Sequence, residues 1–295
     1  MIDSVKISPE TIEATLDELG LGHLAPHIKP LLRPSIAMHL GEGVWGEYDV
    51  IEEKMHDTSP LGASKVGGLP DLPPGFDWPQ KIGDEETISL AFLAQIRLEE
   101  AAPFDREKAL PPHGMLWVFH NLSLDDYGEE VLWSEDVAFL DRRELPANRF
   151  EFAEVAPRLL TFSFGWSLPA TQGREMQGIF EEFGAPRPPE SHRERDAYGE
   201  FHHKMHAPHH LLGHADVLHF DGRPNVRQKE GLSWNDRETS EDVARWEREA
   251  PCWRLLLQFS PEDDFDWGVA VIYAYIHERA LAERDFSGVA FDTQH

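Results

Sequence analysis

The stretch from Ser64 to Ile96 constrains this chain more than any other, because a loop rich in glycine and proline leads into an apolar strand. Prolines remove backbone donors and fix φ, and glycines permit positive φ, so the first part is a shaped loop. These loop residues are Gly67, Gly68, Pro70, Pro73, Pro74, Gly75 and Pro79. Residues 90–96 then predict a strand that is apolar on both faces except at Gln95. A buried Gln95 amide needs partners, which the loop backbone can supply.

Several other runs predict strands, because apolar residues are continuous or alternate over short stretches between glycines and prolines. They cover residues 36–40, 114–120, 131–133, 137–140, 159–164, 253–259 and 268–276. Short helices are predicted after Ser8-Pro9 and after Thr239, where capping residues precede an apolar stripe. Together these elements indicate an α+β fold that is rich in strands, with mostly antiparallel sheets and a few short helices.

Five short signatures follow one another in a fixed order. They are Ser64-Lys65-Val66-Gly67-Gly68-Leu69-Pro70, the strand from Leu90 to Gln95, Leu211-Leu212-Gly213, Leu255-Leu256-Leu257-Gln258 and Asp266-Trp267-Gly268. In this order they resemble the signatures of the YwqG-like family of uncharacterised bacterial proteins, from about Leu61 to Phe291. The resemblance implies an intracellular α+β domain rich in strands. It implies no activity, substrate, cofactor or catalytic residue.

The chain divides into a lead-in of helix and strand, residues 1–60, and a main domain, residues 61–295. One half of this domain covers about 61–165 and the other about 209–295. The polar segment 170–208 between them is expected to be an insertion or lid-like connection outside the core. Each half has a glycine turn, an apolar strand ending in glutamine and a second apolar strand, which suggests an internal duplication with Gln95 and Gln258 in equivalent places. Two buried strands can also look alike by composition alone.

The chain carries 54 acidic and 27 basic residues, which gives a net charge of -27. This charge repels phosphate backbones and anionic membranes, so nucleic acid and membrane partners are not expected, and it favours a basic protein partner. An acidic surface with no specific partner is the other interpretation. The N-terminal residues do not resemble a signal peptide, and the single cysteine, Cys252, excludes an internal disulfide. We therefore expect a cytoplasmic protein.

Histidines crowd residues 202–221, where they are mixed with carboxylates. Such groups can bind zinc or a divalent transition metal, and His214, Asp216 and His219 are the candidate ligands. They lie where the chain departs from the YwqG-like pattern, since relatives tend to have Tyr-Pro after Leu-Leu-Gly and a glutamine further on. A proline and a glycine interrupt the helices that would align histidine pairs, so a solvated, pH-responsive surface is the alternative. No cofactor is otherwise expected.

Lys65 is a lone cation beside a glycine pair, so it either holds an anionic ligand group or pairs with Asp71 or Asp77. A ligand site between the two halves would be lined by Lys65, Gln95, Gln258 and Trp267. The sequence contains no nucleophile elbow, zinc-protease helix, P-loop or dinucleotide fingerprint. The sequence therefore predicts a binding or interaction module whose acidic surface binds a basic protein. It leaves open whether the protein is an enzyme. The alternative is a metal-dependent hydrolase that uses the His-rich region 202–221.

Overall fold

The computed structural model describes residues 7–43, 45–49, 54–82, 87–122, 128–148, 155–223, 240–260 and 271–294. The strands of its main sheet are β1 (Arg33–Gly43), β4 (Lys65–Val66), β8 (Ala91–Arg97), β9 (Met115–His120), β10 (Glu129–Ser134), β12 (Arg158–Ser167), β13 (His210–Leu211), β14 (Trp253–Phe259), β15 (Val271–His277) and β16 (Ala290–Gln294). They form a ten-stranded sheet in the order β10-β9-β8-β4-β12-β1-β13-β14-β15-β16. Every neighbouring pair is antiparallel, so the predicted strand-rich α+β fold is confirmed.

Smaller strand pairs and short helices complete the described fold. The pairs are β2 (Trp45–Asp49) with β3 (Lys54–Asp57), β5 (Asp71–Leu72) with β11 (Asp141–Arg142), and β6 (Gln80–Ile82) with β7 (Thr87–Ser89). The helices are α1 (Ile12–Glu18), α2 (Ala25–Ile28), α3 (Leu98–Ala101), α4 (Arg174–Phe183), α5 (Glu190–Met205), α6 (Ser240–Glu249) and α7 (Glu278–Ala282). The strand predicted at residues 137–140 is wrong, because Phe139 has φ 57° and an 88 % exposed side chain in a turn.

The main core lies on one face of the curled sheet. Ile36, Ile96 and Ile272 pack there with Leu98 of α3 and Leu281 of α7. Each fully buried side chain of this kind contributes about 1.5–3 kcal/mol relative to an exposed one. The two ends of the sheet approach each other around this core, since the ring centroids of His120 on β9 and Phe291 on β16 are 5.7 Å apart.

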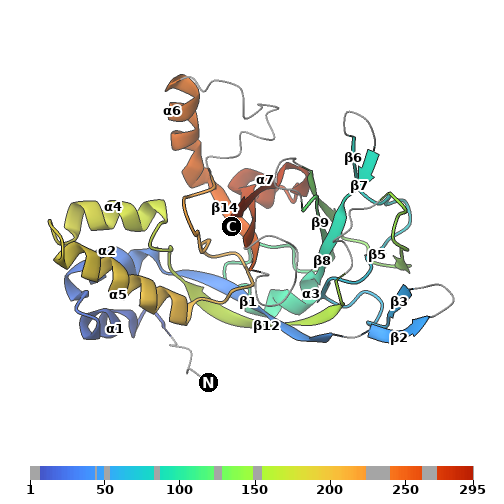
Figure 1. The fold of residues 1–295 in the computed structure, drawn as a ribbon, viewed down its shortest axis with the longest axis horizontal. Helices are drawn as coiled ribbons and strands as arrows, with labels where there is room; N and C mark the ends of the chain where they lie inside the picture. The colour runs from blue at the N-terminus through green and yellow to red at the C-terminus, as the bar shows by residue number, and fades with distance from the viewer. Residues whose placement is uncertain are drawn as a thin grey trace.

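A second core joins the N-terminal helices to α4 and α5 at one end of the molecule (Figure 1). Ile12 and Leu16 of α1 pack there with Met176 of α4 and Tyr198 of α5. The Tyr198 hydroxyl donates to the carbonyl of Pro169 at 2.7 Å, which ties α5 to the end of β12. Segment 170–208 therefore contributes to a hydrophobic core, and the expectation that it lies outside the core is wrong.

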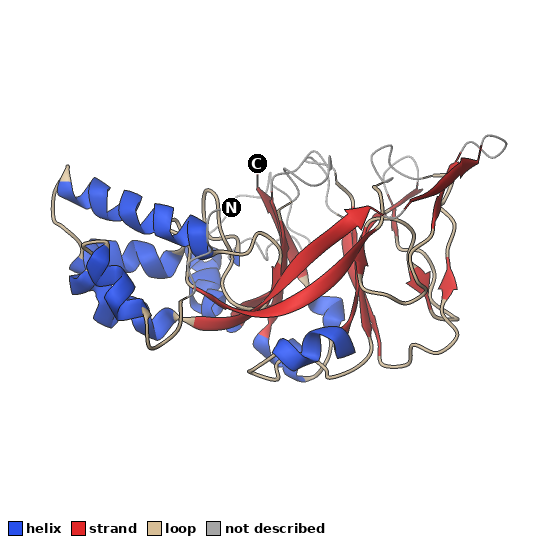
Figure 2. Cartoon of the chain, turned by 90° about the horizontal axis from the view of Figure 1, so that it is seen from below, coloured by secondary structure: helices blue, strands red, loops and turns tan. Residues whose placement is uncertain are grey.

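The long strands β1 and β12 connect this helical end to the rest of the sheet (Figure 2). Residues 33–43 of the predicted lead-in thus supply a central strand, which lies between β12 and β13. Along β1 the residues alternate, so that Ile36 and Met38 enter the main core while Ser35 and His39 lie on the other face. Within the described ranges, no helix has the length and apolarity needed to cross a bilayer.

Gln95 is buried and anchors the glycine-proline loop, as the sequence predicts. In the sheet it pairs with Lys65 on one side and Trp117 on the other. Its Oε1 accepts from the backbone N–H of Asp71 at 2.8 Å, and its Nε2 donates to the carbonyl of Ala63 at 2.8 Å. The Trp117 indole donates to the Asp71 carbonyl at 2.8 Å, so two strands hold one point of the loop.

Gln258 occupies the corresponding place on the other side of β1 and β12. It is buried and pairs with His210 and Tyr273. Its Oε1 accepts from the backbone N–H of Asp216 at 2.8 Å, and the Tyr273 hydroxyl donates to the Asp216 carbonyl at 2.7 Å. Both glutamines therefore fix the loop that follows a two-residue strand. A common origin of the two halves stays a prediction.

Candidate functional site

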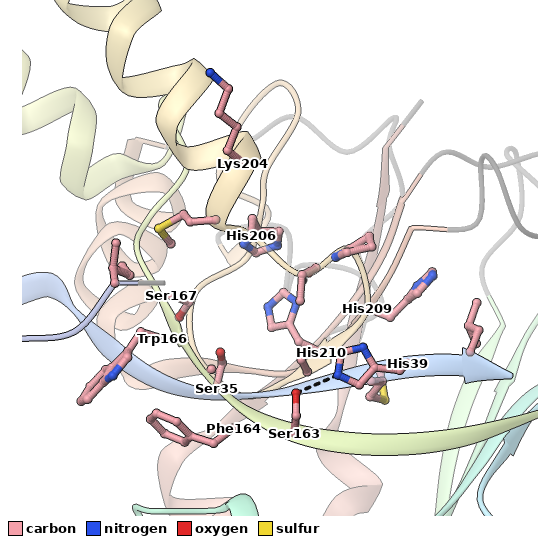
Figure 3. A pocket seen from close by; sticks show the side chains of 18 of the residues that line it. Ser35, His39, Ser163, Phe164, Trp166, Ser167, Lys204, His206, His209 and His210 are labelled. Atoms are coloured by element: carbon pink, nitrogen blue, oxygen red, sulfur yellow. Dashed lines mark hydrogen bonds between the residues drawn. The ribbon is translucent and has the colours of Figure 1, made fainter. Parts of the chain in front are cut away.

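A cavity of about 730 Å³ opens over the central strands β1 and β12 (Figure 3). The two strands form its floor, and the end of α5 with residues 206–210 forms a wall. Its polar lining residues include Ser35, His39, Ser163, Ser167, Lys204, His206, His209 and His210. The β1–β12 register places Ser163 opposite Ala37 and diagonal to His39, so the alternation of both strands brings these side chains to one face.

His39 and Ser163 form a polar pair inside this cavity. The His39 Nε2 atom lies 2.7 Å from the Ser163 hydroxyl. A serine nucleophile with a histidine base would need a third group to orient the imidazole. The rest of the described chain makes no hydrogen bond to the His39 ring. The pair can therefore donate to and accept from a bound molecule, but no described residue serves as the orienting partner of a catalytic triad.

Three histidine rings form a column beside the cavity. The ring centroids of His202 and His206 are 5.1 Å apart, and those of His206 and His210 are 4.7 Å apart. Asp216 lies at one side, with its carboxylate oxygens 3.5 Å from His202 Nδ1 and 3.9 Å from His206 Nε2. Because His202, His209 and His210 are buried, the expectation of a solvated histidine surface is wrong for these residues.

Burial governs the protonation of His206 and His210. It lowers the pKa of His210 to about 4, although hydrogen bonds to the backbone oppose the shift. Burial and the neighbouring imidazoles also lower the pKa of His206 well below its ordinary value. Burial raises the pKa of the Asp216 carboxyl. At neutral pH the two imidazoles are therefore uncharged hydrogen-bonding groups.

Two of the predicted metal ligands, His214 and Asp216, contact different parts of the fold. The His214 ring contacts the carbonyl of Leu31 through Nε2 at 2.7 Å, whereas Asp216 lies beside His202. The backbone N–H of His219 donates to Gln294. In the part of the chain that the structure describes, no three His, Cys, Asp or Glu side chains are grouped to hold a metal ion. The metal-dependent hydrolase hypothesis stays untested, with no ligand set among these residues.

Lys65 belongs to a buried ion network away from the cavity. Its Nζ donates to Asp57 at 2.7 Å and to Ser59 at 2.9 Å, and it lies 3.7 Å from Asp71. Arg142 donates to Asp71 at 2.8 Å. Burial lowers the pKa of Lys65, and the charges of Asp71 and Asp57 oppose that shift. The predicted pairing of Lys65 with Asp71 is confirmed, while Asp57, its closer partner, was not predicted.

The four residues predicted to line a ligand site do not meet in this cavity. Lys65, Gln95 and Gln258 are fully buried and are absent from its described lining. Trp267 lies outside the described residues, as do Asp266 and Gly268. Sequence reasoning instead missed Ser35, His39 and Ser163. The available signal was the alternation of small or polar residues with apolar ones in residues 35–40 and 160–164.

One comparison with known proteins is informative about the whole domain. A family model described as a domain of unknown function, DUF1963, matches residues 64–294, which include the glycine-proline loop, both glutamines and the histidine column. No curated protein matches the chain. The matched range covers most of the 295 residues. The chain therefore belongs to the DUF1963 family of domains of unknown function.

Proposed function

We propose that the protein is a binding module for a small molecule, and that the cavity over β1 and β12 is its site. The observation that carries this proposal is the cavity itself, whose volume of about 730 Å³ lies in the range of about 300–1,000 Å³ typical of small-ligand sites.

The lining supports binding because it mixes apolar area with a few polar groups that can fix orientation. Ile7, Ala37 and Met205 supply apolar area, and the His39–Ser163 pair supplies a donor and an acceptor. The Ser35 side chain also lines this space. The floor is rigid, since β1 and β12 pair over most of their length. A preformed site of this kind avoids the free energy of ordering a loop on binding.

A screen of a fragment library with equal numbers of anionic, cationic and neutral compounds tests the proposal. Ligand-observed NMR should find compounds that bind the natural protein and lose binding in Ser163→Phe, because the added ring occupies the floor of the cavity beside His39. Ser134→Phe is the matched control, since Ser134 is a half-buried residue on edge strand β10 and does not line the cavity. The proposal would be overturned if no library compound binds Ser134→Phe and fails to bind Ser163→Phe.

The net charge of -27 supports a second proposal, the binding of a basic protein by the acidic surface. Immobilised protein should then retain a cationic protein at low salt and release it as the ionic strength rises, because salt screens exposed charges over about 8–10 Å. The matched control is an immobilised unrelated protein of equal net charge. If the two immobilised proteins retain the cationic protein equally, the retention is a non-specific effect of charge and this proposal is wrong.

A further inference from the structure

The cavity differs in charge from the chain that surrounds it. Acidic residues number 54 in 295, yet none of the 19 described residues that line the cavity is Asp or Glu. Two of them, Arg158 and Lys204, are permanent cations, and four are histidines. A space with two cations and no carboxylate in its described lining, inside a strongly acidic protein, selects the sign of a ligand, because the acidic exterior gives no other attraction for an anion.

We infer that the cavity takes a small organic anion, in which a carboxylate or phosphate group is joined to an apolar part. This inference rests on the proposed function and names its ligand class. The anionic oxygens would accept hydrogen bonds from the Ser163 hydroxyl, the Ser35 hydroxyl and the His39 ring, whose side chains lie on one face of the floor (Figure 3). Hydrogen bonds to a charged acceptor are about twice as strong as neutral ones.

The apolar part of the ligand has a separate surface to pack on. This surface is supplied by Ala37 of the floor, Met205 at the end of α5 and Pro208 of the wall. A ligand with an anionic head and an aromatic or aliphatic tail therefore matches both the polar and the apolar parts of the lining.

Two described carboxylates near the lining residues already have partners. Asp216 is held beside His202 and His206, at 3.5 Å and 3.9 Å, and does not line the cavity. Glu200 lies 3.9 Å from Lys204, one helical turn away on α5, and leaves the lysine at the rim. Arg158 donates through Nε to the Gly41 carbonyl at 2.8 Å, which fixes the guanidinium stem beside the β1 end of the cavity.

The test compares Ser163→Asp with Ser163→Asn, since the two side chains have the same shape and differ only in charge. Phenyl phosphate, benzoate, benzylamine and benzyl alcohol form a matched series of probes, with inorganic phosphate as the head group alone. We expect most of the library compounds that lose binding in Ser163→Phe to be anions. Their affinity should fall about tenfold or more further in Ser163→Asp than in Ser163→Asn, because a like charge lies within a few ångströms of the ligand.

The outcomes separate this inference from the proposed function. If the compounds that lose binding in Ser163→Phe are mainly cationic or neutral, the anion inference is wrong and the cavity remains a ligand site. Equal losses in Ser163→Asp and Ser163→Asn would also overturn it. If no library compound loses binding in Ser163→Phe, both the anion inference and the proposed function are wrong. Tighter binding of phenyl phosphate than of benzoate would identify phosphate as the head group, and the reverse order would identify carboxylate.

Discussion

Replacing Lys65 with methionine is expected to lower the free energy of unfolding by about 3–5 kcal/mol, because the substitution leaves buried carboxylates without their cation. The side chains of Lys65, Asp57 and Asp71 are 0 % exposed, so water cannot solvate the charges that remain. Arg142 contacts both carboxylates and offsets part of the loss. Urea unfolding followed by circular dichroism measures the effect.

Lys29→Met is the matched control for this prediction. Lys29 pairs with Glu13 at 2.8 Å, nearly the distance of the Lys65–Asp57 pair, but the two side chains are 39 % and 59 % exposed. An exposed pair of this kind contributes about 0–1 kcal/mol. Equal losses in the two variants would contradict the account of the buried network. Should Lys65→Met fail to fold, Ser59→Ala gives a milder test, because Ser59 bonds to both Lys65 and Asp57.

Stability is expected to fall by about 5–6 kcal/mol between pH 7 and pH 5, as a sum over three buried histidines. Burial lowers the pKa of His120 and His210 to about 4 and that of His214 to about 3, whereas all three return to about 6.5 on unfolding. Between these values the unfolded state binds more protons than the folded state, so acid favours unfolding. Each group contributes roughly 2 kcal/mol over this interval. Urea unfolding at a series of pH values measures the slope.

His120→Asn should reduce this pH slope by about one proton. The Nδ1 atom of His120 accepts from the backbone N–H of Leu122 at 2.8 Å, a bond that the Asn oxygen can keep without titrating. His113→Asn is the control, since His113 is exposed and pairs with Glu135 at the surface. A slope that is the same in His120→Asn as in the natural protein would show that this histidine does not supply the predicted proton.

Much of the fold could be predicted from the sequence, because hydrophobic periodicity is a local signal. The strands around Gln95 and Gln258 stand out for this reason, and the need of a buried amide for partners correctly pointed from Gln95 to the loop. The strand predicted at 137–140 failed because apolar composition alone does not prevent a turn, and Phe139 lies exposed in one. Polar residues outnumber apolar ones in segment 170–208, so its composition predicts a place outside the core. Its apolar residues nevertheless pack in the second core.

The candidate cavity could not be predicted, because it depends on pairing between distant strands. His39 and Ser163 are separated by 124 positions in the chain and meet only through the β1–β12 register. Nothing local distinguishes them from other polar residues on half-buried strands. The same reason explains Asp57, which lies in the predicted lead-in yet binds Lys65. The histidine-rich region stands out in the sequence by its density of histidines. His206, His209 and His210 belong to the candidate site because they lie beside β1 and β12 and line the cavity.

The most direct test of the ligand site is a titration of protein with ¹³C-labelled histidine rings by the tightest library binder. The account predicts that the His39 and His206 signals move as the ligand saturates the protein, because both rings line the cavity. The signals of His113 and His277, which do not line it, should stay in place. Shifts confined to His113 and His277, or no histidine shift at saturation, would contradict the claim that ligands bind over β1 and β12.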